Sequence, residues 1–598
     1  MHMKRLTLIT LLAALLTLPS FAEPVDAYRA GETARSFFRN DPSPARRLAT
    51  LRQVNLYGAP LTKASQEAPA FYIFNREGGG FVIVSGDDAC KPILAYSYEN
   101  NFGSVEDMPD GLRDWLADFE AQVALVRKTG ARPSASPANA DMTAYQPEVI
   151  HDTPAWHQGA PFNRLCPKDN GKDSWVGCVP LAVSLVMNYF GHPSYGTGTL
   201  PSYDYQYNGR SYHISGIELG HKYEWEKFRN VDFNKSYSDA QANAVATLIR
   251  DVAIAGKASF SADATDTNFE RIVPAILEHF GYDRNVTHLK RWYFTDEEWM
   301  DLIKGELQDH PVIYAANTSN GGHAFVVDGY DRKNNLHINW GWGPDYIGYY
   351  ALSAFIPSSG QDYKFEHTTV LGLVPDKGQG GSPEEYLYLC SGQGSDGRLY
   401  KGLSADSTPE HGKEFTADVA WYYNGGINDF YGRFAFALID KNGNIVEKIS
   451  NDNIIKGLVP RGGQGVFGIS CKINSYPIFG DKVQLIYRSD KWPEGVWKLP
   501  YRRLDDGVVD VIEVKADGTL LGESTSLNYS KTDGKVSLKT KDRVTWKLSD
   551  SSGKVVAEGV SEDFKISIST SGLAKGSYTL WLGRDKEGQG ITLNIGEK

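Results

Sequence analysis

The stretch GCVPLAVSLVMNYFGHP, residues 177–193, decides how the central part of this chain folds. Only two residues between 181 and 190 are plainly polar, and a helix that is apolar nearly all round is a buried one. Pro180 suits the first turn of a helix, and Gly191 suits its end. The pattern therefore predicts a core helix with Cys178 at or just before its N-terminus. Free N–H groups and the helix dipole favour an anion there, and a thiolate is an anion.

Two interpretations of Cys178 remain open on this stretch alone. It is either a small hydrophobic residue that fills the helix end or a nucleophile. A free thiol with a pKa near 8.5 is only about 3% ionised at pH 7, and lowering that pKa to about 4 needs roughly 6 kcal/mol. A helix terminus supplies at most about 2 kcal/mol. A nucleophilic Cys178 therefore needs an ion pair with a base from elsewhere in the chain.

One of the 13 histidines lies in an unusual setting, SNGGHAFVVDGYDRKNNLHINWGWG, residues 319–343. His323 directly follows Gly321 and Gly322. Because glycines permit close approach of a backbone, we expect these two to contact the substrate. His323 is the candidate base for Cys178. On its own it is equally a surface histidine beside a glycine turn.

The segments on either side of DRKNN alternate like the two strands of a hairpin. Folding that hairpin about residue 331 places Asn339 opposite His323, with Trp340 beside it. An amide in that place holds one ring nitrogen of the imidazole and leaves the other free for sulfur. Singly, Asn339 is a turn amide and Trp340 a packing residue. Together with a cysteine 145 residues upstream of the histidine, they match the order and spacing of papain-like enzymes.

The N-terminal segment MHMKRLTLITLLAALLTLPSFAEP is typical of a secretory signal peptide. Basic residues precede an apolar run at 6–18, and Ser-Phe-Ala at 20–22 fits a cleavage site. The run is too short to cross a membrane, and no later apolar stretch reaches the roughly 18 residues that a span needs. We expect a secreted protein without a transmembrane segment, and attachment to the cell surface is left open.

The composition excludes several classes of function. The net charge is −11, from 62 basic and 73 acidic residues, which argues against nucleic-acid and anionic-membrane binding. No CxxC or HExxH motif is present, so we expect no metal and no cofactor. The odd number of cysteines leaves at least one thiol unpaired, and pairing of Cys390 with Cys471 is left open. For Cys166 we expect a packing role, with a redox partnership to Cys178 as the alternative.

The 598 residues predict three to four domains. Two helical patterns and three short strands precede an exposed linker, TGARPSASPANAD, and a mixed helical and strand region follows it. Beyond about residue 384 short alternating runs and Gly, Asn and Asp turns predict two all-β sandwiches. We therefore expect an α+β fold with all-β modules behind it. The expected pieces are 1–22, 23–141, 142–375, 384–512 and 513–598.

Four segments of the central piece resemble the streptopain family of secreted cysteine proteases. They are WHQGAPFNRLCP, GCVPLAVSLVMNYFGHP, PVIYAANTSNGGHAFVVDGY and HINWGWGPDYIGYYAL, and their order and spacing match the family over residues 150–375. GGFVIVSGDD and ILAYSY in the first piece are similar to the inhibitory propeptide of that family. The resemblance implies a papain-like fold, endopeptidase activity on protein substrates, and a zymogen that its own propeptide blocks until cleavage.

Carried over by motif, Cys178 is the nucleophile and His323 the general base and acid, and Asn339 and Trp340 match the pair that orients the histidine. The backbone N–H of Cys178 is then one donor to the oxyanion. Two positions depart from relatives. Ala315 stands where streptopain has a glutamine, and Lys172 stands where papain has one. No second oxyanion donor is therefore identified, and Pro180 also replaces an expected small residue.

Other features follow by analogy only. The loop at 256–267 is expected to line the pocket for the side chain next to the scissile one. The ending GLAKGSYTLWLGRDKEGQGITLNIGEK weakly resembles bacterial sorting domains, and an ordinary sandwich end is the alternative.

Two other functions stay open on the sequence. One is a cell-wall amidase or transpeptidase with the same Cys-His-Asn chemistry. The other is an adhesin whose β modules bind a cell surface or the host matrix.

Overall fold

The computed structural model divides the chain into two compact units, Met1–Glu384 and Glu385–Lys598. The residues that the structure describes are 23–48, 50–55, 68–130, 141–229, 231–233, 235–318, 321–353, 366–379, 381–393, 398–475, 477, 480–504, 507–515, 528–532, 534–539, 545–561, 565–582 and 590–595. The expected signal peptide and most of the expected linker after residue 130 lie outside the described residues. No helix among the described residues is both long enough and apolar enough to span a bilayer.

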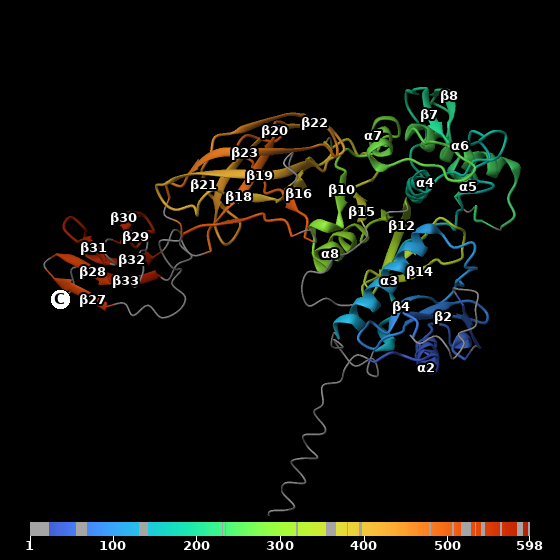
Figure 1. The fold of residues 1–598 in the computed structure, drawn as a ribbon, viewed down its shortest axis with the longest axis horizontal. Coiled ribbons are helices and arrows are strands. Elements are labelled where there is room, and N and C mark those ends of the chain that lie inside the picture. The colour runs from blue at the N-terminus through green and yellow to red at the C-terminus, as the bar shows by residue number, and fades with distance from the viewer. Residues whose placement is uncertain are drawn as a thin grey trace, which may run out of the picture. The chain divides into compact units, whose positions relative to one another are not determined.

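One antiparallel sheet runs through the first unit (Figure 1). Its order is β1 (Leu51–Val54), β2 (Phe71–Arg76), β3 (Phe81–Ser85), β4 (Ile93–Ser97), β14 (Gly348–Ala351), β13 (Asn335–Asn339), β12 (Gly321–Asp331), β11 (Val312–Thr318), β15 (Glu366–Leu371) and β10 (Thr287–Lys290), and β5 (Pro147–Ile150) also pairs with β12. β4 and β14 join at Tyr96 and Tyr349. Strands of the expected propeptide and of the expected protease thus share one sheet.

The helices of the first unit agree closely with the apolar periodicity. They are α2 (Ala27–Phe38), α3 (Asp110–Thr129), α4 (Cys178–Phe190), α5 (Trp225–Phe228), α6 (Asp239–Ala255), α7 (Phe269–His279) and α8 (Asp296–Glu306), with short 3-10 turns at Pro44–Arg46, Met142–Ala144 and Arg291–Tyr293. The predicted core helix is confirmed as α4, which is buried from Val179 to Asn188. It ends at Gly191 with φ 61°, a left-handed conformation that glycine adopts readily.

Helix α6 packs against α4, α5 and α7, and α4 also packs against β12 and β11 (Figure 1). α3 lies against the same two strands. Two small two-stranded sheets complete this unit, β6 (Thr199–Leu200) with β9 (Ile217–Glu218) and the hairpin of β7 (Tyr203–Tyr207) with β8 (Arg210–Ile214). Strands β11 and β12 are therefore the elements that α3 and α4 have in common.

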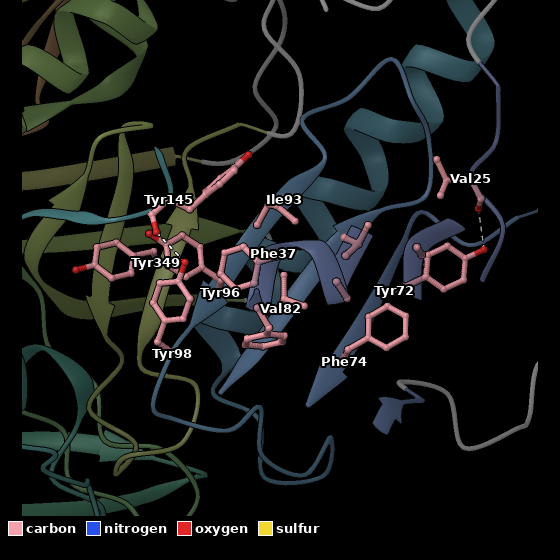
Figure 2. Packing of buried hydrophobic residues seen from close by; sticks show 14 residues of the cluster. Val25, Phe37, Tyr72, Phe74, Val82, Ile93, Tyr96, Tyr98, Tyr145 and Tyr349 are labelled. Carbon is pink, nitrogen blue, oxygen red and sulfur yellow. Dashed lines mark hydrogen bonds between the residues drawn. The ribbon is translucent and has the colours of Figure 1, made fainter. Parts of the chain in front are cut away.

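An aromatic cluster ties the N-terminal part to the rest of the first unit (Figure 2). Phe37 stacks on Tyr98 with ring centroids 5.0 Å apart, and Tyr96 stacks on Tyr349 at 4.9 Å. The Tyr98 hydroxyl donates a hydrogen bond of 2.9 Å to the carbonyl of Tyr145. Since aromatic pairs add to the free energy of area burial, this cluster holds the N-terminal part firmly in place.

The second unit contains only strands among its described residues, which confirms the all-β prediction. Its first two sheets run β17 (Leu399–Lys401), β16 (Leu387–Gln393), β19 (Glu414–Asn424), β18 (Leu403–Ala405), with β23 (Gly463–Lys472) and β25 (Tyr501–Arg502), and β21 (Ile445–Lys448), β20 (Phe430–Ile439), β24 (Lys482–Ser489), β26 (Ile512–Glu513), with β22 (Asn453–Leu458). The other two run β27 (Asn528–Thr532), β28 (Lys535–Lys539), β31 (Lys565–Ser569), and β30 (Val555–Val560), β29 (Thr545–Ser549), β32 (Gly576–Leu582), β33 (Gly590–Ile595).

Candidate active site

Cys178 is the first residue of α4 and is partly exposed. Gly177 before it has φ 90°, and a Cβ at that glycine would lie 3.0 Å from the carbonyl oxygen of Thr265. Thr265 belongs to the loop at 256–267, so this loop borders the helix start. No side chain caps α4.

His323 is buried on β12, where it lies opposite Ala316 of β11. Its Nε2 atom donates to the carbonyl oxygen of Trp340, 3.1 Å away. The imidazole lies close enough to Cys178 for each group to shift the pKa of the other, and the backbone N–H groups of Ala324 and Val179 also act on the sulfur. The structure therefore brings the predicted nucleophile and base together.

The two side chains shift each other's pKa in opposite directions. Burial raises the pKa of Cys178, but the hydrogen bond and charge attraction of His323, with the two backbone N–H groups, hold it below its ordinary value. Burial lowers the pKa of His323, but Cys178, the Trp340 carbonyl and the charge of Asp110 hold it above its ordinary value. A lowered thiol pKa and a raised imidazole pKa favour a thiolate–imidazolium pair.

The other cysteines behave differently. Burial raises the pKa of Cys90, Cys166 and Cys471 to about 12, which keeps these thiols neutral. Because the Cys166 thiol is buried and neutral, a packing role is favoured over a redox partnership with Cys178. No disulfide joins Cys390 to Cys471 in the described part of the chain.

The predicted pairing of His323 with Asn339 across the hairpin is wrong. β12 and β13 pair Val326 with Asn339, so the histidine lies beyond the last paired residue. The turn is centred on Lys333, two residues later than predicted, because the Asp331 carboxylate accepts a hydrogen bond of 2.8 Å from the Lys333 backbone N–H. A bulge between positions 327 and 329 changes the register by one residue.

Asn339 instead shapes the turn that follows it. Its Nδ2 donates 3.0 Å hydrogen bonds to Oγ1 of Thr153 and to the carbonyl of Pro154. Its Oδ1 accepts a 3.1 Å hydrogen bond from the backbone N–H of Gly341. These bonds hold the intervening Trp340 carbonyl, which is the group that accepts from the histidine.

The ring of Trp340 is fully buried in an aromatic cluster. It packs against Phe325 at 4.7 Å, Tyr350 at 5.2 Å and Trp115 at 6.0 Å between ring centroids. Trp115 comes from α3, in the N-terminal part. The ring therefore serves packing, while the backbone of the same residue faces the imidazole.

The remaining predicted positions lie around this core. Gly321 and Gly322 open β12 opposite the end of β11, and residues 319 and 320 beside them lie outside the described residues. Lys172 is exposed in a turn with Asp169, and Ala315 is buried opposite Ala324. Among the described residues, no cluster of His, Cys, Asp and Glu side chains is arranged to hold a metal ion.

Sequence reasoning did not single out Gln158 as a candidate site residue. This polar residue is buried, and its backbone carbonyl accepts a hydrogen bond of 3.0 Å from the N–H of Val176. Val176 precedes Cys178 by two residues, so Gln158 lies against the entry to α4. Its 20-residue distance from Cys178 hid it, because the papain spacing of six residues pointed to Lys172.

Helix α3 covers the face of the sheet that carries His323. A Cβ at Gly111 would lie 2.7 Å from the Cβ of His323, so the start of the helix touches the histidine. One turn later Trp115 stacks on His367 with centroids 5.1 Å apart, and its Nε1 donates to the carbonyl of Ala351 at 3.0 Å. Substrate cannot occupy this face while α3 is in place.

Comparison with known proteins agrees with this geometry. Residues 156–350 match the Peptidase C10 family, and residues 22–123 match the Spi protease inhibitor family. Over 305 residues the chain is 30% identical to streptopain of Streptococcus pyogenes. The matched region covers 48% of this chain and 75% of streptopain. The chain belongs to the streptopain-like peptidase C10 family. It is therefore a cysteine peptidase with an inhibitor-type propeptide, and the predicted resemblance is confirmed.

Two other known proteins are also similar to this chain. The chain is 32% identical over 394 residues to the thiol protease/hemagglutinin PrtT of Porphyromonas gingivalis, covering 62% of this chain and 44% of PrtT. It thus spans less than half the length of that relative. A structure of a prointerpain A fragment from Prevotella intermedia is 26% identical, with a TM-score of 0.45, over 55% of this chain and 99% of that fragment.

Proposed function

We propose that this chain is the zymogen of a secreted cysteine endopeptidase, with Cys178 as nucleophile and His323 as general base and acid. The observation that carries the proposal is the contact of these two residues at the uncapped start of α4. The depressed pKa of Cys178, against the raised pKa of Cys90, Cys166 and Cys471, supports the assignment. Protein substrates and an exported location follow from this proposal.

The reaction needs four groups. The Cys178 thiolate attacks the scissile carbonyl, and the imidazolium of His323 protonates the leaving amine. Water then enters, gives its proton to the neutral imidazole and releases the acyl group. The backbone N–H of Cys178 stabilises the oxyanion, and we assign the second donor to the side chain of Gln158 because of its buried place beside the helix entry.

Latency resides in the N-terminal part. Because α3 lies on His323 and Trp115 fills the aromatic cluster behind it, the propeptide must leave before a substrate can bind. We place its removal within residues 128–150, where the sequence predicts an exposed linker. The protease domain then covers 142–375, and 384–512 and 513–598 are two further modules.

The cell-wall alternative loses support from the inhibitor match, because a propeptide of this kind accompanies proteolysis. An adhesive role for the second unit stays compatible with proteolysis. Binding of residues 385–598 to host matrix proteins tests that role separately.

A gel time course on the full-length chain and its Cys178→Ala variant tests the proposal. We expect the wild type to shorten itself and then digest casein, and an epoxide inhibitor of papain-like enzymes to label Cys178. The variant should stay full length and inert. Trimming both proteins with an added protease is the control for activation from outside. A trimmed wild type that neither digests casein nor takes up the label contradicts the proposal.

A further inference from the structure

A series of hydrogen bonds holds the turn that presents the Trp340 carbonyl to His323. Thr153 accepts from Asn339 Nδ2 at 3.0 Å and donates its own hydroxyl proton to Oδ2 of Asp328 at 2.5 Å. Asp328 is 2% exposed, and its other carboxylate oxygen is hydrogen-bonded to Nδ1 of His337. A chain of hydrogen bonds therefore runs from a buried carboxylate to the backbone that orients the histidine.

The chemistry of each group determines which one donates and which one accepts in this series of hydrogen bonds. An ionised carboxylate only accepts, and a hydroxyl has a single proton. Since Thr153 gives that proton to Asp328, its lone pairs face Asn339, which must present Nδ2. The Oδ1 of Asn339 is then left to accept from Gly341, as observed. Asp328 thereby selects the amide orientation of a residue that it does not touch.

Resting on the proposed function, we propose that Thr153 and Asp328 are positioning residues for the protease reaction. They hold the Asn339 turn so that the Trp340 carbonyl stays within hydrogen-bonding distance of His323. They touch neither substrate nor the reacting atoms.

The position of this turn affects Cys178 because it affects the pKa of His323. Three groups raise that pKa: Cys178, the Trp340 carbonyl and Asp110. Asp110 belongs to the propeptide and leaves with it, whereas the Trp340 carbonyl stays in the processed enzyme. A loosened turn lowers the pKa of His323 and, because the pair is coupled, raises the pKa of Cys178.

Three threonine substitutions in the full chain test this assignment after activation. Thr153→Val keeps the shape and removes the hydroxyl, and Thr153→Ser restores it. Thr369→Val is the control, because Thr369 of β15 is buried and, like Thr153, donates its hydroxyl, here at 3.0 Å to the Ile313 carbonyl, away from the Asn339 turn. Asp328→Asn is a second variant in case Thr153→Val does not fold. It removes the acceptor-only group.

The measurements are kcat and KM on a peptide and the pH profile of Cys178 alkylation by iodoacetamide, read by mass spectrometry. For Thr153→Val we expect kcat to fall about tenfold with KM within about twofold, since one or two hydrogen bonds are lost. The alkylation profile should move to higher pH, and Thr153→Ser should restore both. The alkylation readout requires no proteolysis.

Superimposable profiles for Thr153→Val and wild type, or an equal shift in Thr369→Val, would overturn the inference. If wild-type Cys178 itself is alkylated like an ordinary thiol with a pKa near 8.5, the proposed function fails, and this inference fails with it.

Discussion

Trp115 of the propeptide stacks on His367 of the protease, with ring centroids 5.1 Å apart and ring planes at 24°. His367 and His323 lie opposite Ala316 from its two sides, so the three side chains share one face of the sheet. Gly111 touches His323 and Trp115 touches His367, one helical turn apart. One face of α3 therefore contacts both histidines.

Trp115→Ala should weaken this latency. The indole contacts the rings of Phe325, Trp340 and His367, and large-to-small changes of this kind cost about 3–5 kcal/mol. We expect the full-length chain to process itself at least tenfold faster, measured by gel time course and by hydrolysis of a fluorogenic peptide. The control is Leu125→Ala on an exposed position of the same helix. Equal rates for the two variants would contradict the proposed role of α3.

Gly111→Ala should loosen the propeptide by a different route. The added Cβ would lie 2.7 Å from the His323 Cβ, closer than real contacts allow, so either α3 or the histidine must move. Gly31→Ala is the matched control, because it adds a methyl group to another propeptide helix, where its nearest neighbour is the flexible end of Arg35 at 3.7 Å.

We expect Gly111→Ala to accelerate processing, whereas Gly31→Ala should leave the rate unchanged. Thermal unfolding of both variants separates loosening of α3 from general destabilisation. An unchanged processing rate in an intact Gly111→Ala protein would show that the contact is not tight.

Local features of the sequence predicted the helices well. The apolar run after Cys178, with Pro180 early and Gly191 at the end, gives α4 nearly residue for residue. Such elements depend on neighbours in the chain, which periodicity reports directly. The predicted contact of Cys178 with His323 also holds.

The periodicity of the sequence does not report strand register or the pairing of strands that are far apart in the chain. The side chain of Asp331 moved the hairpin turn, and the bulge at Asp328 moved the register again. Asn339 therefore acts on the backbone of Trp340 instead of on the imidazole. The junction of Tyr96 with Tyr349 joins strands far apart in the sequence, and only the packed structure reveals it.

Gln158→Ala tests the second oxyanion donor. Loss of one such donor typically lowers kcat by about 10²- to 10³-fold with a small change in KM. Lys172→Ala is the control, because that residue stands at the papain position but is exposed in a turn. We expect a large loss in kcat for Gln158→Ala and none for Lys172→Ala in steady-state peptide hydrolysis. The reverse pattern would contradict the assignment to Gln158.

The pH dependence of kcat/KM should be bell-shaped. The directions of the pKa shifts of Cys178 and His323 determine where it rises and where it falls. The pKa of Cys178 lies below its ordinary value, so activity should rise at a pH below the normal range of a thiol. The pKa of His323 lies above its ordinary value, so activity should fall only above the normal range of an imidazole. Because Asp110 contributes to the raised pKa and leaves with the propeptide, the pKa of His323 should be lower in the processed enzyme than in the zymogen. Titration of the His323 imidazole by NMR in both forms provides that comparison. A single rise near pH 8.5, without a fall, would mean that thiol and imidazole do not form an ion pair.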